Sequence, residues 1–321
     1  MLQPEQPLQI NLLGDFCLIN QGVVVSGMRG RSQQLLAYLI LHRQAPQPRR
    51  RVASVLWPDA LESQARTNLR KELHHLRQTH PSIEQLVSTT HQALQWQPTV
   101  SCRVDVDVFE SALAAATAVT GQAALPYLET ALDAYQGDLW PDSDAEWLYP
   151  DQERLRQQHV RALAQATRLL KDTGATAKAM TLGQQWLAAA PLDEGAYQTL
   201  MVLYGEQGDR ATALQLYHQC MTTLQTELGV TPSATTADLY QRLLMDAAAA
   251  EAPPALPAIA PSYLELPIPA AKPLTRPTPA NTLVGRDELC PVLEQWLSLT
   301  DEPSAPLLLL TGEPGIGKTR L

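Results

Sequence analysis

The sequence of 321 residues is poor in aromatic side chains, which make up 5% of it and include two phenylalanines. Cysteine is also scarce, and no cysteine has a second cysteine or a histidine at the short spacing that metal ligands use. Neither a disulfide framework nor a zinc site is therefore predicted, and a reducing, cytoplasmic compartment is expected. The four cysteines are Cys17, Cys102, Cys220 and Cys290.

Long apolar runs are missing as well. The run Leu307–Leu310 has four residues, whereas a transmembrane helix needs about 20. The segment Met1–Ile10 has no basic region followed by an apolar stretch, so no signal peptide is predicted. The motifs G-x-S-x-G and H-E-x-x-H are absent, which leaves no reason to propose a hydrolase. We expect no membrane partner.

An excess of positive charge is lacking overall, since the net charge is −9. The basic residues are nevertheless concentrated. From Arg29 to His80, ten Lys and Arg stand against three Asp and Glu, a local charge of +7 that leaves −16 on the rest. Phosphate attraction is local, because salt screens it over about 10 Å. A basic segment on an acidic protein therefore suits polyanion binding, although a solvated charged face would give the same pattern.

Up to about Pro98, the spacing of apolar residues is typical of β-strands in some segments and of α-helices in others. Short extended runs near the N-terminus predict a small antiparallel sheet, and two more around a polar turn predict a hairpin. Three helical patterns lie between them. The expected strands are Leu8–Leu13, Phe16–Ile19, Val23–Val25, Leu86–Thr89 and Ala93–Trp96, and the expected helices are Ser32–Arg43, Arg50–Trp57 and Ser63–Gln78.

The third of these helices carries a candidate DNA-binding surface. Its apolar residues recur at helical spacing on one face, which leaves basic and short polar side chains on the other. Such residue types read base edges and phosphates in a major groove. Arginines that precede the first and second helices are candidate phosphate anchors. An ordinary solvent-facing basic helix is the alternative. The candidate residues are Arg66, Thr67, Asn68, Arg70, Lys71, His74 and Arg77 on the helix, and Arg29, Arg31 and Arg49–Arg51 (Arg50 and Arg51 above all) before it.

A helical repeat is predicted for residues 104–248, which are rich in Ala and Leu. Four pairs of like residues recur at one offset of 34, the period of tetratricopeptide repeats. Small Ala residues at such positions let two helices approach closely. The pairs are Leu169 and Leu203, Gly174 and Gly208, Ala179 and Ala213, and Leu182 and Leu216.

A proline-rich linker is predicted for residues 249–280, where nine of the 25 prolines lie after Glu251. Proline lacks a backbone donor, so this stretch should be extended and semi-rigid.

A phosphate-binding loop follows the linker, in residues 281–321. The run Gly312–Thr319 satisfies G-x-x-x-x-G-K-[ST], and an apolar run precedes it as the motif requires. Lys318 would reach the terminal phosphates, and the Thr319 hydroxyl would bind Mg²⁺. Since the sequence stops two residues after Thr319, no ATPase activity is expected here, and ATP and Mg²⁺ are expected only with a full ATPase domain. The candidate nucleotide-binding residues are Gly312, Gly315, Gly317, Lys318 and Thr319.

The order of these segments resembles the streptomycete antibiotic regulatory protein type of activator, in which an OmpR-like winged helix precedes a bacterial transcriptional activator domain. The resemblance covers nearly the whole chain. The wing departs from the family pattern, since its turn, Thr89-Thr-His-Gln-Ala93, lacks the usual glycines and aromatic residue. The carrying segments are Leu12–Phe16, Leu35–Leu39, Leu56–Asp59, Ala65–Arg70, Val104–Glu110, Leu224–Pro232 and, ahead of the phosphate loop, Leu283–Glu288 as in signal-transduction ATPases.

The resemblance implies a mostly α-helical protein with a small β component. A winged helix over residues 1–103 would bind double-stranded DNA with helix 63–78. A tetratricopeptide-like domain over residues 104–248 would aid homodimerisation and contact RNA polymerase. Two alternatives remain open: an ATP-dependent signalling switch, and an interaction scaffold that does not bind DNA.

Overall fold

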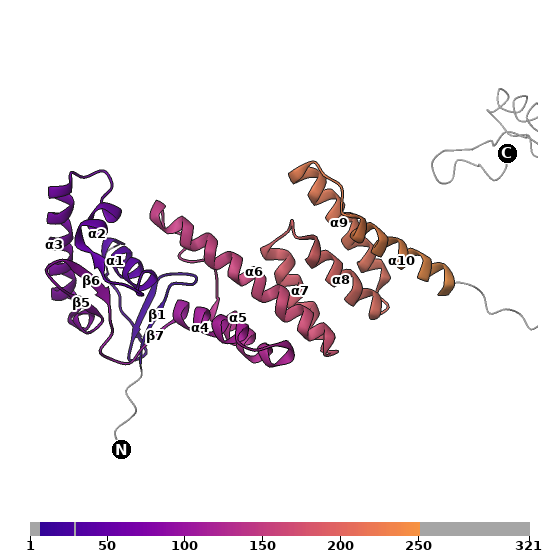
Figure 1. The fold of residues 1–321 in the computed structure, drawn as a ribbon, viewed down its shortest axis with the longest axis horizontal. Helices are drawn as coiled ribbons and strands as arrows, with labels where there is room; N and C mark the ends of the chain where they lie inside the picture. Colours follow the sequence, from indigo (N-terminus) through magenta and orange to yellow (C-terminus); the bar gives the residue numbers. More distant parts are fainter. Residues whose placement is uncertain (1–6, 29, 251–321) are drawn as a thin grey trace, which may run out of the picture. The chain divides into compact units, whose positions relative to one another are not determined.

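The structure is a computed structural model that describes residues 7–28 and 30–250 (Figure 1). These residues are mostly helical and contain two small sheets, so the predicted fold class is confirmed. No helix in these ranges is both long and apolar enough to cross a membrane. Arg29, the proline-rich linker after Glu251 and the phosphate-loop motif lie outside the described residues.

The N-terminal sheet has four strands in the order β3-β2-β1-β7. The first three form an antiparallel meander, whereas β7 returns from much later in the chain and pairs parallel with β1. Leu8 and Ile10 are buried while Gln9 and Asn11 are half-buried, which is the alternation of a strand with one face on the core. The strands are β1 (Leu8–Asn11), β2 (Cys17–Asn20), β3 (Val23–Val24) and β7 (Cys102–Val104).

Three helices and a second sheet complete the winged helix. The second sheet has the order β4-β6-β5, and its β5–β6 hairpin is the wing. Glu62 in the first turn of α3 and Arg77 in its last turn both complement the helix dipole. The elements are α1 (Gly30–Leu41), β4 (Gln47–Pro48), α2 (Arg49–Leu56), α3 (Glu62–Thr79), the 3₁₀ turn η1 (Pro81–Gln85), β5 (Val87–Thr89) and β6 (Ala93–Trp96).

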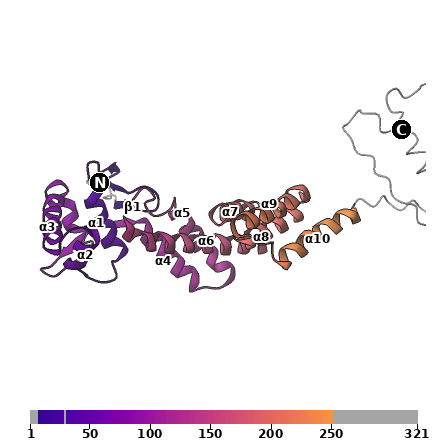
Figure 2. The same ribbon diagram turned by 90° about the horizontal axis from the view of Figure 1, so that it is seen from above.

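The remaining described residues form stacked helices, seen in two orientations in Figures 1 and 2. The 34-residue period is visible in the structure. Gly174 and Gly208 both adopt positive φ, +74° and +81°, where α6 and α8 end. Ala179 and Ala213 are fully buried at equivalent helix contacts. The elements are α4 (Asp105–Thr117), η2 (Gly121–Ala124), α5 (Leu125–Ala134), η3 (Glu146–Leu148), α6 (Tyr149–Asp172), α7 (Thr176–Ala189), α8 (Glu194–Glu206), α9 (Arg210–Leu228) and α10 (Ala234–Ala250).

The hydrophobic core of the winged helix does not stop at β7. The same cluster of buried side chains includes Phe109 from α4, Leu139 from the segment between α5 and η3, and Leu155 from α6. Backbone hydrogen bonds cross in the same place, from Trp140 N–H to the Leu12 carbonyl at 2.9 Å. The winged helix and the first repeat helices are therefore joined by a common core rather than by a flexible hinge.

Candidate nucleic-acid interface

Helix α3 has one buried face and one open face. Ala65, Leu69 and Leu76 are at most 2% exposed and pack into the core beside α1 and α2. In both views of the ribbon, α3 lies on the side of α1 away from α4 and α6 (Figures 1 and 2). The helix is thus fixed along one side and accessible along the other, as a groove-binding helix must be.

The open face of α3 is lined by cations. Arg66, Arg70 and Lys71 are exposed, and none of them has a carboxylate within ion-pair distance among the described residues. Arg70 lies along the helix, with its Nη2 donating to Thr67 Oγ1 at 3.4 Å. His74 is also exposed, whereas Thr67 and Asn68 are half-buried at the edges of the face. The structure thus brings the predicted α3 residues onto one continuous basic surface.

Two of the predicted arginines are paired with acids. Arg77 Nε lies 3.3 Å from Glu84 Oε1, and Arg50 Nη2 lies 3.0 Å from Glu62 Oε2. All four side chains are at least 44% exposed, so each pair is weak in water and can open to a phosphate. Arg51 is exposed on the first turn of α2.

Arg31 has a structural contact that the sequence pattern does not reveal. Its Nη1 donates to the Leu56 carbonyl at 2.6 Å, and its guanidinium lies 5.9 Å from the centre of the Trp57 ring. A carbonyl at the end of a helix has no partner within the helix, so Arg31 satisfies the C-terminus of α2. The same group is then less free to reach DNA than the arginines of α3.

The rotation of α3 is fixed by a polar contact with α1. Ser32 Oγ donates to Glu72 across the two helices, and Ser32 is 1% exposed. The sequence contains a signal for this contact that our pattern analysis missed: Ser32 precedes Leu35 and Leu36 at helical spacing, so a polar residue occupies a core position of α1. Glu72 is therefore the acid of α3 that faces inward rather than toward a nucleic acid.

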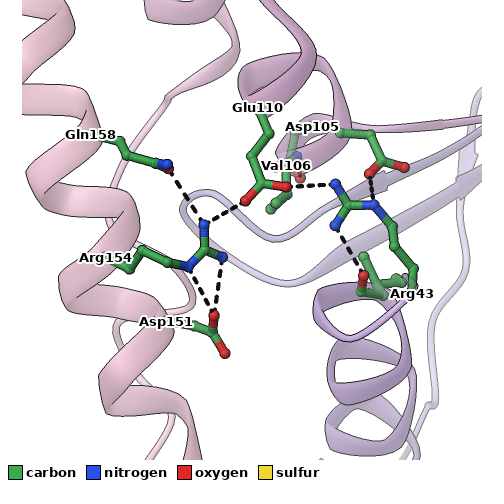
Figure 3. Close-up of polar contacts among 9 residues, drawn as sticks. Arg43, Asp105, Val106, Glu110, Asp151, Arg154 and Gln158 are labelled. Carbon is green, nitrogen blue, oxygen red and sulfur yellow. Dashed lines mark hydrogen bonds and ion pairs between the residues drawn. The ribbon is translucent and has the colours of Figure 1, made fainter. Parts of the chain in front are cut away.

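A second group of charges lies where the winged helix meets α4 and α6 (Figure 3). Arg43, just after α1, pairs with Asp107 and with Glu110, whose Oε2 lies 2.5 Å from Arg43 Nη2. Glu110 Oε1 lies 2.6 Å from Arg154 Nη1, and Arg154 also pairs with Asp151 at 3.0 Å. One carboxylate thus bridges an arginine of the winged helix and an arginine of α6.

The bridging carboxylate is held in its charged form. Burial alone would raise the pKa of Glu110, but the hydrogen bonds from Arg43 and Arg154 outweigh burial and bring the pKa below its ordinary value. Asp105 adds a link nearby that involves no arginine, since its Oδ2 accepts the N–H groups of Leu12 and Leu13, each at 2.7 Å. Arg43 belongs to the basic segment of the sequence, but its guanidinium is paired with carboxylates of the same chain and therefore stabilises the fold instead of binding a ligand.

The helical region matches a known domain family. Residues 104–244 match the family model of the bacterial transcriptional activator domain. The matched residues run from the end of β7 into α10, directly behind the winged helix.

Known regulators are similar to this chain. The regulatory protein AfsR of Streptomyces coelicolor is 28% identical over 199 residues, which are 60% of this chain and 19% of AfsR. AfsR of Streptomyces griseus is 31% identical over 175 residues, 54% of this chain and 17% of that protein. The chain therefore spans less than a fifth of the length of these relatives.

Among solved structures, EmbR of Mycobacterium tuberculosis, in complex with a low-affinity phosphopeptide, has a similar fold. Its TM-score is 0.61 at 22% identity, over 75% of this chain and 66% of EmbR. The arrangement of a winged helix before stacked helices is thus shared in fold with EmbR.

Proposed function

We propose that this chain is a cytoplasmic transcription regulator that binds double-stranded promoter DNA with α3 in the major groove. The observation that carries the proposal is the open face of α3, where Arg66, Arg70 and Lys71 have no acidic partner within residues 7–28 and 30–250, while the opposite face packs into the core. Cations placed in this way release counterions from phosphates on binding. The partly buried hydrogen bond from Ser32 to Glu72 helps to hold the basic face of α3 outward.

The side chains of α3 fall into two groups for this task. Arg66, Arg70 and Lys71 are long donors for phosphates and guanine edges, and Asn68 can pair with adenine. Gln64 Nε2 donates to Asn68 Oδ1 at 2.9 Å, which leaves the Asn68 amide donors free to face a base. Arg50, Arg51 and Arg77 would hold flanking phosphates.

The helical domain supplies the other part of the proposal. We expect it to support a homodimer and contact with RNA polymerase, with activation rather than repression as the outcome. Support for these three points comes from the resemblance to activators and from the family match over residues 104–244. The same proposal includes the domain boundaries: residues 104–248 form one domain, and residues 249–280 form the linker after it.

DNA binding is tested by fluorescence anisotropy with a random duplex pool at two salt concentrations, followed by sequencing of the bound fraction. We expect a repeated motif to be enriched and affinity to fall steeply with salt. Arg70→Glu should lower affinity for that motif by about 100-fold or more. Arg161→Glu, the same change at an exposed position of α6, is the matched control. A wild-type protein that binds no DNA at low salt would favour the scaffold alternative.

A second candidate activity rests on the motif Gly312–Thr319 alone. Its spacing supports nucleotide binding through backbone N–H groups and Lys318, as the first part of an ATP-dependent switch. Nucleotide affinity that is measurable in the wild type and lost in Lys318→Ala would support this candidate. Equal signals from both proteins would argue against it.

A further inference from the structure

The wing has an unusual turn for a hairpin. The segment from Thr89 to Ala93 contains no glycine, and none of its residues adopts the positive φ that tight two-residue hairpin turns require. Thr90 instead closes the turn with its own groups. Its N–H donates to the Ala93 carbonyl at 2.9 Å, and its Oγ1 accepts the Ala93 N–H at 3.0 Å.

Arg49, the first residue of α2, binds this turn from outside the hairpin. The Arg49 N–H donates to the Gln92 carbonyl at 2.9 Å, and Arg49 Nε donates to the Thr90 carbonyl at 3.0 Å. One residue thus engages two carbonyls on either side of His91. The backbone contact with Gln92 continues the pairing of β4 with β6, in which Pro48 lies opposite Ala93, and the Nε contact adds a side-chain bond beyond it.

Arg49 differs from its two neighbours. Arg50 and Arg51 are exposed, whereas Arg49 is half-buried. Partial burial, and then the charges of Arg77 and Arg70, lower the pKa of Arg49 below its ordinary value. A side chain whose only function was to meet a phosphate would be better placed, like Arg50, in open solvent.

We propose that Arg49 is a positioning residue that holds the wing turn in place against α2, so that His91 and Gln92 are presented at a fixed distance from α3. The effect on DNA rests on the proposed function. The effect on the wing does not, since it follows from the two hydrogen bonds alone. In this wing, an arginine from outside the hairpin holds a turn that lacks the positive-φ residues of a tight two-residue hairpin.

The test compares Arg49→Lys with Arg50→Lys in the full chain. Both keep the positive charge, but lysine has a methylene where arginine has Nε and cannot donate to Thr90 from that place. Amide exchange at Ala93, measured by NMR or mass spectrometry, reports on the turn without DNA. We expect exchange at Ala93 to speed up about three- to tenfold in Arg49→Lys and to stay unchanged in Arg50→Lys. Unchanged exchange in Arg49→Lys would overturn the proposal.

A second measurement separates positioning from phosphate binding. With the selected DNA motif, Arg49→Lys should lose about three- to tenfold in affinity while the dependence of log K on log salt stays the same, because no charge is removed. A wing that loosens without any loss of affinity would also overturn the positioning role. If the wild type binds no DNA, the proposed function fails, while the exchange measurement still decides what Arg49 does to the wing.

Discussion

The arginines of α3 and Arg43, which follows α1, use the same type of side chain in opposite ways. Arg66 and Arg70 on α3 are exposed and have no acid partner among the described residues. Arg43 is only 16% exposed in its side chain and pairs with two carboxylates. Both sets belong to the same basic segment of the sequence. A cluster of arginines in the sequence therefore indicates that these side chains need anionic partners. Only the fold shows whether the partner is a carboxylate of the same chain or a separate molecule.

The difference has an energetic consequence. Removing one member of a buried charge network leaves the others without compensation, which costs far more than removing a solvated charge. An exposed arginine contributes little to stability but much to binding a polyanion. Stability and DNA affinity should therefore respond to different arginines.

The largest expected effect tests whether the two regions can be separated at all. A fragment of residues 1–103 loses Phe109, Leu139 and Leu155 from the common core, all fully buried in the structure. We expect this fragment to lack a cooperative thermal transition by circular dichroism, while residues 1–250 unfold cooperatively. A sharp transition in the short fragment would show that the winged helix is an independent folding unit.

A paired substitution sharpens the comparison between the arginines. Arg43→Gln should lower the free energy of unfolding by roughly 2–3 kcal/mol, because Glu110 and Asp107 lose their common partner. Arg70→Gln should change it by no more than about 0.5 kcal/mol and instead weaken DNA binding about tenfold. Urea unfolding and anisotropy measure the two effects. Equal destabilisation by the two substitutions would contradict the assignment.

The smallest expected effect is a pH dependence at the junction. The pKa of Glu110 is held below its ordinary value, so the unfolded chain takes up a proton at higher pH than the folded one. The contribution of Glu110 is therefore fully present above its ordinary pKa and is lost as the pH falls through the lowered one. Between about pH 6 and pH 3, the wild type should lose more stability than Glu110→Gln. Asp107, whose pKa burial raises in spite of Arg43, titrates in both proteins.

Much of the fold could be predicted from periodicity. The helix expected at Ser63–Gln78 is α3, with one more residue at each end, and the 34-residue offset corresponds to equivalent turns at Gly174 and Gly208. These features are local, because each depends on residues within one or two helices. Strand β4 was missed, since two residues cannot show a period and one of them is Pro48.

The candidate site was less accessible to sequence reasoning. The α3 residues share one face because of helix geometry, which the sequence determines. The roles of Arg31, Arg43 and Arg49 depend instead on groups that lie far away in the chain, such as the Leu56 carbonyl, Glu110 and the wing carbonyls. A pattern analysis sees an arginine before a helix and assigns a phosphate to it, because the internal acceptor belongs to another segment.

The parallel pairing of β1 with β7 also affects how the protein is made. Asp105, which binds the N–H groups of Leu12 and Leu13, follows Leu12 by 93 residues. On the ribosome, the first strand to emerge must therefore wait for the start of α4 before its sheet closes, and for Leu155 before its core is filled. The basic helix α3 leaves the ribosome well before either event. A nascent chain thus completes the fold around α3 only once the first helices of the repeat region have been synthesised.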